Sequence, residues 1–192
     1  MNIATALNKK YIPYTVVMLT SLCINTPEHI DAFLLNSELD KADILSMENA
    51  LSDYDICLHP LNIDKNNFSD RLPKNDKWSL ETYYRLLLLD ILPIDVKRIL
   101  YLDVDLIITV SLSALYNMDF NGLMILAAID ACGELAPKDY GPKHQEMFSE
   151  AYQHGYTYFN AGVMLLNIDQ MRRTYSFKTY LDAINAWNYE MV

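Results

Sequence analysis

Glycine is scarce in this sequence, with 5 residues among 192, about a third of the usual share of ~7%. Neither G-x-G-x-x-G nor G-x-x-x-x-G-K-[ST] occurs, so the two glycine-rich loops that bind nucleotide phosphates are excluded. A protein of this sequence that binds phosphates must therefore use cationic side chains, a metal ion or helix ends.

Cysteine is also sparse, and neither cysteine nor histidine recurs at the spacing of a metal-binding motif. An odd number of widely separated cysteines implies no disulfide scaffold and predicts reduced, partly buried thiols in a reducing compartment. We expect the histidines to be surface or loop residues. The residues concerned are Cys23, Cys57, Cys132, His29, His59, His144 and His154.

Positive charge is in the minority, since 15 basic side chains stand against 25 acidic ones and the net charge at pH 7 is −10. This balance disfavours a surface that binds the phosphates of DNA or RNA. No basic segment with a cleavage site opens the chain, and no uncharged run approaches the ~18 residues that span a bilayer. We therefore expect a cytoplasmic protein without a transmembrane segment, and a length of 192 residues predicts a single domain.

Hydrophobic residues are plentiful, at 52% of the sequence, and they fall in short apolar runs that alternate with helical patterns. This alternation is typical of an α/β protein with a mostly parallel sheet flanked by helices. The apolar runs predict strands at residues 3–7, 32–35, 55–58, 99–102, 123–129 and 162–166, and the helical patterns predict helices at 11–25, 41–51, 79–92 and 177–187. Surface loop is predicted at 61–76, and a loop with a helix at 137–154.

The string Asp103-Val104-Asp105 has the clearest chemical meaning. It follows the apolar run 99–102, so it is predicted at the carboxyl end of a buried strand, the edge where open α/β sheets bind their ligands. A second D-x-D string, at 53–55, precedes a predicted strand, where aspartates are ordinary turn residues. Two such strings are about what chance gives for this aspartate content, so the prediction rests on the context and not on the string.

If strand geometry persists beyond residue 102, Asp103 and Asp105 point to the same side and Val104 points away. Two converging carboxylates suit a hard divalent cation such as Mn²⁺ or Mg²⁺, which is commonly held by one or two carboxylates and substrate phosphates. The residues alone leave two alternatives open. The aspartates could be solvated strand-end acids, or they could be the nucleophile and the acid of a haloacid-dehalogenase-like phosphatase, whose motif normally closes the first strand of its domain.

Five segments share the order and separations of the motifs of one enzyme family. They are NIATALNKKYIPY, ETYYRL, RILYLDVDLII, AAIDA and YFNAGVMLLN. Through them, nearly the whole chain resembles glycosyltransferase family 8, the group that includes bacterial lipopolysaccharide galactosyl- and glucosyltransferases and glycogenin. The resemblance implies a GT-A (Rossmann-like) fold, a UDP-sugar donor and a Mn²⁺ ion on the D-x-D pair. It also implies transfer of a hexose, from UDP-galactose or UDP-glucose, to a glycan or lipopolysaccharide acceptor with retention of anomeric configuration.

For the first segment, the resemblance implies that Ala6, Asn8 and Tyr11 hold the uracil and the ribose. An aromatic face can stack on a base, although on the residues alone Tyr11 is equally consistent with a core tyrosine. At Asn8 the sequence departs from the family, which commonly has aspartate there. Asparagine can still accept a hydrogen bond but brings no charge, so donor affinity or base preference is expected to differ.

The resemblance also implies roles for residues in the later segments. The D-x-D residues 103–105 contact the donor and its metal, Arg85 binds the donor sugar or the diphosphate, and Asp130 and Asn160 accept hydrogen bonds from sugar hydroxyls. Two of these residues have simpler interpretations. Arg85 could pair with Glu81 one helical turn away, and Asn160 could be a turn-forming asparagine.

Two further motifs of the family come later than these segments. One is an acidic Q-x-D-x-D-like segment, and the other is an H-x-x-G-x-K-P-W-like string that supplies a third metal ligand and a lysine for the diphosphate. The chain ends at Val192 before either. We therefore expect a C-terminally incomplete catalytic core with weak donor binding and little or no transfer, and the alternative is an inactive core that only binds nucleotide or a partner.

Overall fold

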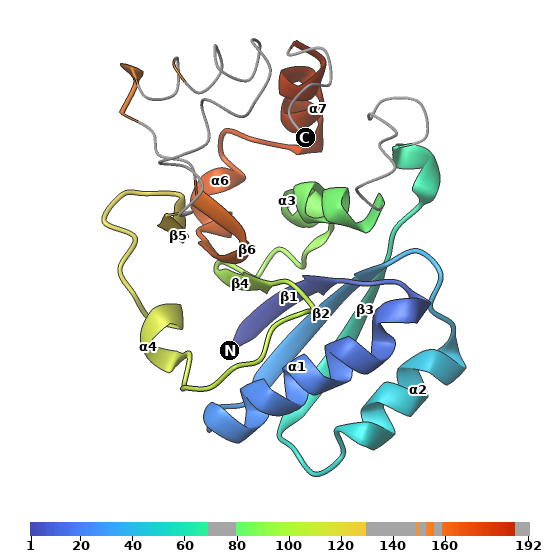
Figure 1. Ribbon diagram of the computed structural model, residues 1–192. Coiled ribbons are helices and arrows are strands. Elements are labelled where there is room, and N and C mark those ends of the chain that lie inside the picture. Colours follow the sequence, from blue (N-terminus) through green and yellow to red (C-terminus); the bar gives the residue numbers. More distant parts are fainter. Residues whose placement is uncertain (69–79, 130–148, 150–152, 156–158, 187–192) are drawn as a thin grey trace.

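The strands predicted from the apolar runs pair into one sheet (Figure 1). The computed structural model describes residues 1–68, 80–129, 149, 153–155 and 159–186. In this part of the chain, a 6-stranded sheet has the order β3-β2-β1-β4-β6-β5. The strands are β1 (Asn2–Ala6), β2 (Ile30–Asn36), β3 (Ile56–Asn62), β4 (Ile99–Leu102), β5 (Ile125–Ile129) and β6 (Phe159–Leu166).

The sheet is mostly parallel, as predicted. Strands β3, β2, β1 and β4 run parallel to one another, whereas β6 runs antiparallel to both of its neighbours, β4 and β5. Because β6 is reversed, its amino end lies beside the carboxyl end of β4. Residues that are about 60 positions apart in sequence therefore meet at one edge of the sheet.

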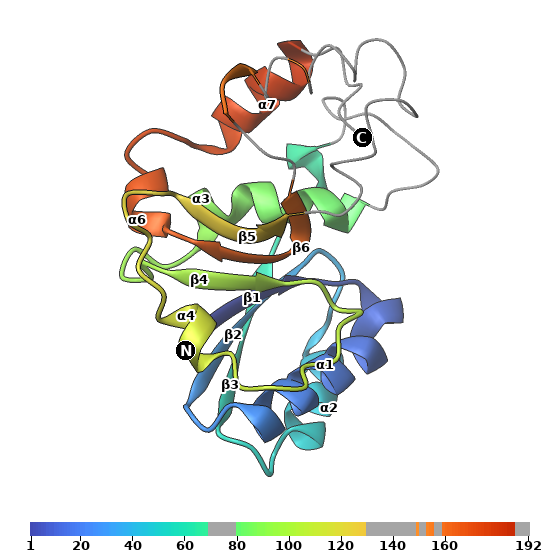
Figure 2. The same cartoon turned by 60° about the vertical axis from the view of Figure 1, so that its left-hand side comes forward.

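Helices cover both faces of this sheet (Figures 1 and 2). On one face, α1 (Ile12–Asn25) and α2 (Lys41–Ala50) pack against apolar side chains of β1, β2 and β4. On the other face lie the 3-10 helix η3 (Leu80–Leu87), α3 (Leu88–Ile91), α6 (Ile168–Met171) and α7 (Phe177–Ala186). The remaining short elements are η1 (Lys9–Tyr11), η2 (Lys65–Asn67) and α4 (Ser113–Tyr116). None of the helices in the described ranges is long and apolar enough to cross a membrane.

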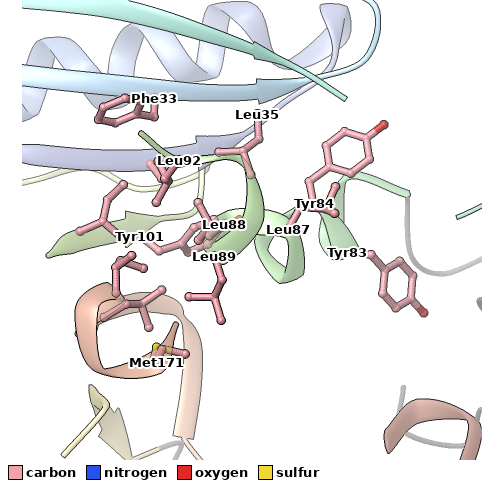
Figure 3. Close-up of a cluster of buried hydrophobic side chains, with 14 of the residues drawn as sticks. Phe33, Leu35, Tyr83, Tyr84, Leu87, Leu88, Leu89, Leu92, Tyr101 and Met171 are labelled. Atoms are coloured by element: carbon pink, nitrogen blue, oxygen red, sulfur yellow. The ribbon is translucent and has the colours of Figure 1, made fainter. Parts of the chain in front are cut away.

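The apolar face predicted for residues 79–92 is confirmed by the core that it forms with the sheet. Tyr84, Leu87 and Leu88 are buried against strand residues that include Phe33 and Tyr101 (Figure 3). Burying each large apolar side chain contributes about 1.5–3 kcal/mol, so this contact fixes η3 and α3 firmly on the sheet. The segment differs from the prediction in beginning as a 3-10 helix, and the predicted cap at residue 79 lies outside the described residues.

Two other strand boundaries differ from the prediction by three residues or more. β3 extends to Asn62, four residues further than predicted, because all seven of its residues pair in register with β2. Pro60 within it is tolerated because β3 is the edge strand of the sheet. β6 begins three residues earlier than predicted, at Phe159, and the short helices α4 and α6 have too few residues to show a helical period in the sequence.

Candidate active site

Three segments singled out in the sequence meet at the carboxyl edge of the parallel strands. β1 and β4 are neighbours with Ala4 opposite Tyr101, so the segment that follows β1 runs beside the segment that follows β4. The backbone amide of Asp103 donates to the carbonyl oxygen of Gly162 at 2.8 Å. The edge therefore brings residues 6–11 and the D-x-D segment together with the first residues of β6.

The D-x-D segment is a turn and not a continuation of its strand. β4 ends at Leu102, and Val104 and Asp105 lie in the turn, so the premise that strand geometry persists through residue 105 is wrong. The expected difference between the three side chains, with both aspartates accessible and the valine turned away, is nevertheless observed. Val104 is buried against Leu7, whereas Asp105 is exposed and Asp103 is partly exposed. Val104 thus anchors the turn, and any contact that it makes with a ligand would use its backbone.

Arg85 binds the first aspartate of the pair. One terminal nitrogen of its guanidinium lies 3.1 Å from Asp103 Oδ1, the other donates to the carbonyl of Ala161 at 2.6 Å, and Nε donates to the carbonyl of Thr82 at 3.0 Å. The Arg85 side chain is only 17% exposed. Within the described residues its carboxylate partner is therefore Asp103, and the alternative pair with Glu81 does not form.

Tyr101 packs against the guanidinium of this ion pair. Its ring lies under the guanidinium of Arg85, with Arg85 Cζ 4.5 Å from the ring centroid, a geometry that favours a cation–π interaction. Burial raises the pKa of the Tyr101 hydroxyl; the nearby charge of Arg85 opposes this effect, and the carboxylates of Asp103 and Asp105 add to it. The hydroxyl therefore stays protonated in a site that gathers one cation and two anions.

Asn160 and Gly162 approach the same carboxylate from β6. Asn160 Oδ1 accepts a hydrogen bond from the backbone amide of Gly162 at 2.8 Å, so its carbonyl group makes the local contact of a turn-forming asparagine. A Cβ atom added to Gly162 would lie 2.9 Å from Asp103 Oδ2 and 3.1 Å from Asn160 Oδ1. Glycine is needed here for the close approach of Asp103, not for an unusual backbone angle.

Replacing Gly162 with alanine is therefore expected to displace the carboxylate of Asp103. If the D-x-D segment binds Mn²⁺, as the family resemblance implies, Gly162→Ala should weaken that binding by about 10–100-fold, the usual cost of disturbing the groups that orient a metal ligand. Calorimetric titration with Mn²⁺ measures it. Ala161→Ser, which adds one atom at the exposed neighbouring residue, is the matched control, and equal Mn²⁺ affinity in the two variants would contradict the expectation.

The loop after β1 is held in place by caps and ion pairs. Asn8 Oδ1 accepts from the backbone amide of Lys10 at 3.1 Å and so caps η1. Lys9 Nζ lies 2.8 Å from carboxylate oxygens of both Asp40 and Asp43 at the start of α2. The hydrogen bond from Lys9 lowers the pKa of Asp40 to about 2. These contacts fix the backbone that precedes Tyr11.

The other two residues of this segment differ in accessibility. Ala6 is partly exposed at the end of β1 and packs against the η3 side of the core. Tyr11 is 36% exposed, and its ring centroid lies 5.6 Å from that of Tyr14. Tyr11 is therefore not a core tyrosine, and part of its ring is open to a ligand.

The two aspartates have the donor chemistry of a hard-cation site. A carboxylate has enough lone pairs for Asp103 to accept from Arg85 and still offer oxygen to a cation, and Asp105 is exposed. In the part of the chain that the structure describes, no third carboxylate, imidazole or thiolate joins them. The pair thus fits Mg²⁺ or Mn²⁺, which accept water and phosphate oxygens as their remaining ligands. Asp130 lies outside the described residues.

Sequence reasoning missed two residues of this site. Tyr101 was hidden within an apolar strand, and Gly162 was noted only as the start of one. The scarcity of glycine was the available signal for Gly162, because a rare glycine at a strand start can mark a close backbone approach.

The family model and the curated relatives that this chain matches are all of glycosyltransferases. The family model of "Glycosyl transferase family 8" matches residues 2–190. A lipopolysaccharide 1,3-galactosyltransferase of Salmonella typhimurium is 29% identical over 87% of this chain and 48% of its own length. A lipopolysaccharide 1,2-glucosyltransferase of Escherichia coli is 26% identical over 88% of this chain and 48% of its own length. The chain thus spans about half the length of these relatives.

The fold has a solved counterpart. The crystal structure of galactosyltransferase LgtC in complex with donor and acceptor sugar analogs superposes with a TM-score of 0.84, at 25% identity, over 100% of this chain and 66% of that one. This chain therefore has the GT-A fold, as predicted.

Proposed function

Because the chain belongs to glycosyltransferase family 8, we propose that it is the donor-binding core of a hexosyltransferase that uses a UDP-sugar and a divalent metal. GT-A glycosyltransferases generally use a nucleotide-sugar donor and a divalent cation. The observation that carries the proposal is the accessible pair Asp103 and Asp105 on a turn beside the loop after β1. The 192 residues would act as one catalytic core.

Each segment at the edge has a separate task in this proposal. Tyr11 offers a partly exposed ring on which the uracil can stack, and Asn8 and Ala6 line the path of the base and ribose. Asn8 differs from the aspartate that is common in the family, and its neutral amide makes a weaker hydrogen bond to a donor group than a carboxylate does. We therefore expect the affinity for the nucleoside to be modest.

Asp103 and Asp105 would hold Mn²⁺ or Mg²⁺ against the diphosphate. When bound, the metal supplies a Lewis acid that neutralises the charge of the departing UDP. The chain's own contribution is to keep Asp103 in one orientation through the contact with Arg85 and the close approach of Gly162. Arg85 is a positioning residue here, because three of its hydrogen bonds are already made within the protein.

The sugar end of the donor would lie at the start of β6. The side-chain oxygen of Asn160 already accepts from the amide of Gly162, so in this proposal its amide nitrogen, and not its oxygen as the family resemblance implies, would bind a sugar hydroxyl. We propose galactose or glucose as the sugar, Asp130 as a second partner of its hydroxyls, retention of anomeric configuration, and a glycan or lipopolysaccharide as acceptor. The two lipopolysaccharide transferases among the relatives support this choice of acceptor.

Calorimetry with UDP tests the proposal. We expect UDP to bind only when Mn²⁺ or Mg²⁺ is present, and UDP-galactose or UDP-glucose to be the sugar donor that is hydrolysed or transferred. GDP and CDP are the matched control nucleotides. UDP binding that does not need a divalent metal, or no preference for UDP over GDP, would contradict the assignment.

The position of the D-x-D segment along the chain argues against the haloacid-dehalogenase-like phosphatase. Its D-x-D motif closes the first strand of the domain, whereas here the segment follows β4, which three other strands precede in the described residues. The chain order therefore favours the transferase.

A further inference from the structure

A second cluster of metal-binding side chains lies at the opposite edge of the sheet, where β2 and β3 begin. Asp31 on β2 is paired in register with Cys57 on β3, so their side chains share one face of the sheet. His29 immediately precedes β2, and His59 follows Cys57 by two residues and lies on the same face. The cluster thus combines imidazole, thiol and carboxylate groups within one small area.

The ligand atoms of three of these residues are already close together. One atom each from His29, Asp31 and Cys57 can be chosen so that all three lie within 4.8 Å of one another. His29 Nε2 is 3.6 Å from Asp31 Oδ1. Ligands of tetrahedral zinc, at about 2.0–2.3 Å from the metal, lie roughly 3.3–3.8 Å apart, so only small side-chain rotations separate this cluster from a zinc geometry.

Neighbouring groups orient two of the ligands. His29 Nδ1 is 2.6 Å from Asp55 Oδ1, which leaves Nε2 directed at the cluster. His59 Nε2 is 2.8 Å from Asp31 Oδ1, and the His59 ring stacks on Phe33 with centroids 4.9 Å apart. A carboxylate on the second nitrogen of a ligating histidine is the usual outer contact of a zinc site, because it fixes the tautomer and raises the basicity of the ligand.

From this arrangement we propose that His29, Asp31 and Cys57 bind a divalent transition metal of the zinc type, with water in the fourth position. A thiolate and an imidazole select zinc over Mg²⁺ or Ca²⁺, which prefer oxygen ligands. One thiolate and one carboxylate balance the charge of the metal ion. The site is independent of the donor-metal site, which lies at the carboxyl edge of the sheet and has only oxygen ligands.

Titration of the full, reduced, metal-free chain tests the proposal. Zn²⁺ is added in competition with a chromophoric chelator, and Co²⁺ is added to record the near-ultraviolet absorption of a thiolate–cobalt bond. We expect one Zn²⁺ per chain and a thiolate–cobalt band in the wild type. Cys57→Ser should abolish the band, and Asp55→Asn should weaken Zn²⁺ binding by about 10–100-fold.

Matched controls separate this site from the other candidate ligands. Cys23→Ser and Cys132→Ser remove the other two cysteines, and Asp103→Asn removes a ligand of the proposed donor site; each should leave the cobalt band intact. Cys57 is exposed, so Cys57→Ser should fold normally, which far-ultraviolet circular dichroism checks. A cobalt band that persists in Cys57→Ser, or a wild type without one, would overturn the proposal.

Discussion

Replacing Asp103 with asparagine is expected to lower sugar transfer, however slow it is in the wild type, by about two to three orders of magnitude. The substitution keeps the size of the side chain and can keep a hydrogen bond to Arg85, but it removes a negative charge of the proposed metal site. Losing one preorganised electrostatic contact to the transition state typically costs 10²–10³ in rate, and a divalent metal held by Asp103 and Asp105 would supply several kcal/mol of such stabilisation. Transfer from UDP-sugars and metal-dependent UDP binding should fall together.

The second D-x-D string provides the control. Asp53 is exposed and lies in the turn before β3, so Asp53→Asn makes the same chemical change at a place without a proposed ligand. Asp53→Asn should bind UDP and Mn²⁺ as the wild type does. If Asp103→Asn kept Mn²⁺-dependent UDP binding at the wild-type level, the metal site would not be on this segment.

Much of the fold could be predicted because its central strands β1, β2 and β4 are largely buried. Such strands form short continuous apolar runs, and each of the six runs proved to contain a strand. The errors arose where burial is weaker. β3 alternates between partly buried and exposed residues, so its last residues could not be distinguished from loop. The first three residues of β6 are exposed and are held in the sheet by pairing, which leaves no hydrophobic signal.

The sites were predictable only where their residues are adjacent in the sequence. The D-x-D segment follows a buried strand, and that context was sufficient to place it at the carboxyl edge. The contact of Arg85 with Asp103 joins residues that are 18 positions apart, and Asp31 meets Cys57 only through the pairing of β2 with β3. Histidines and cysteines without a regular spacing can therefore still converge, because strand register and not sequence distance brings them together.

Arg85 allows a sharper test than a single substitution. If it acts by positioning Asp103, Arg85→Ala should reduce transfer by about 10–100-fold, the cost of losing a group that orients a metal ligand. Three lost hydrogen bonds at a side chain that is 17% exposed should also lower the free energy of unfolding by about 1–3 kcal/mol. Arg85→Lys keeps the charge but not the planar fork, so its transfer rate should lie between those of the wild type and Arg85→Ala.

The double variant decides how Arg85 acts. In the Asp103→Asn background, Arg85→Ala should cause little further loss of transfer, because the group that it positions has already lost its metal. A double-mutant cycle on transfer and on Mn²⁺-dependent UDP binding should therefore give a coupling of about 1–3 kcal/mol. Additive losses would contradict this and would assign Arg85 to the donor itself, as the resemblance to the family implies. The guanidinium of Arg85 already donates hydrogen bonds to Thr82, Ala161 and Asp103. We therefore expect the double-mutant cycle to show coupling between Arg85 and Asp103.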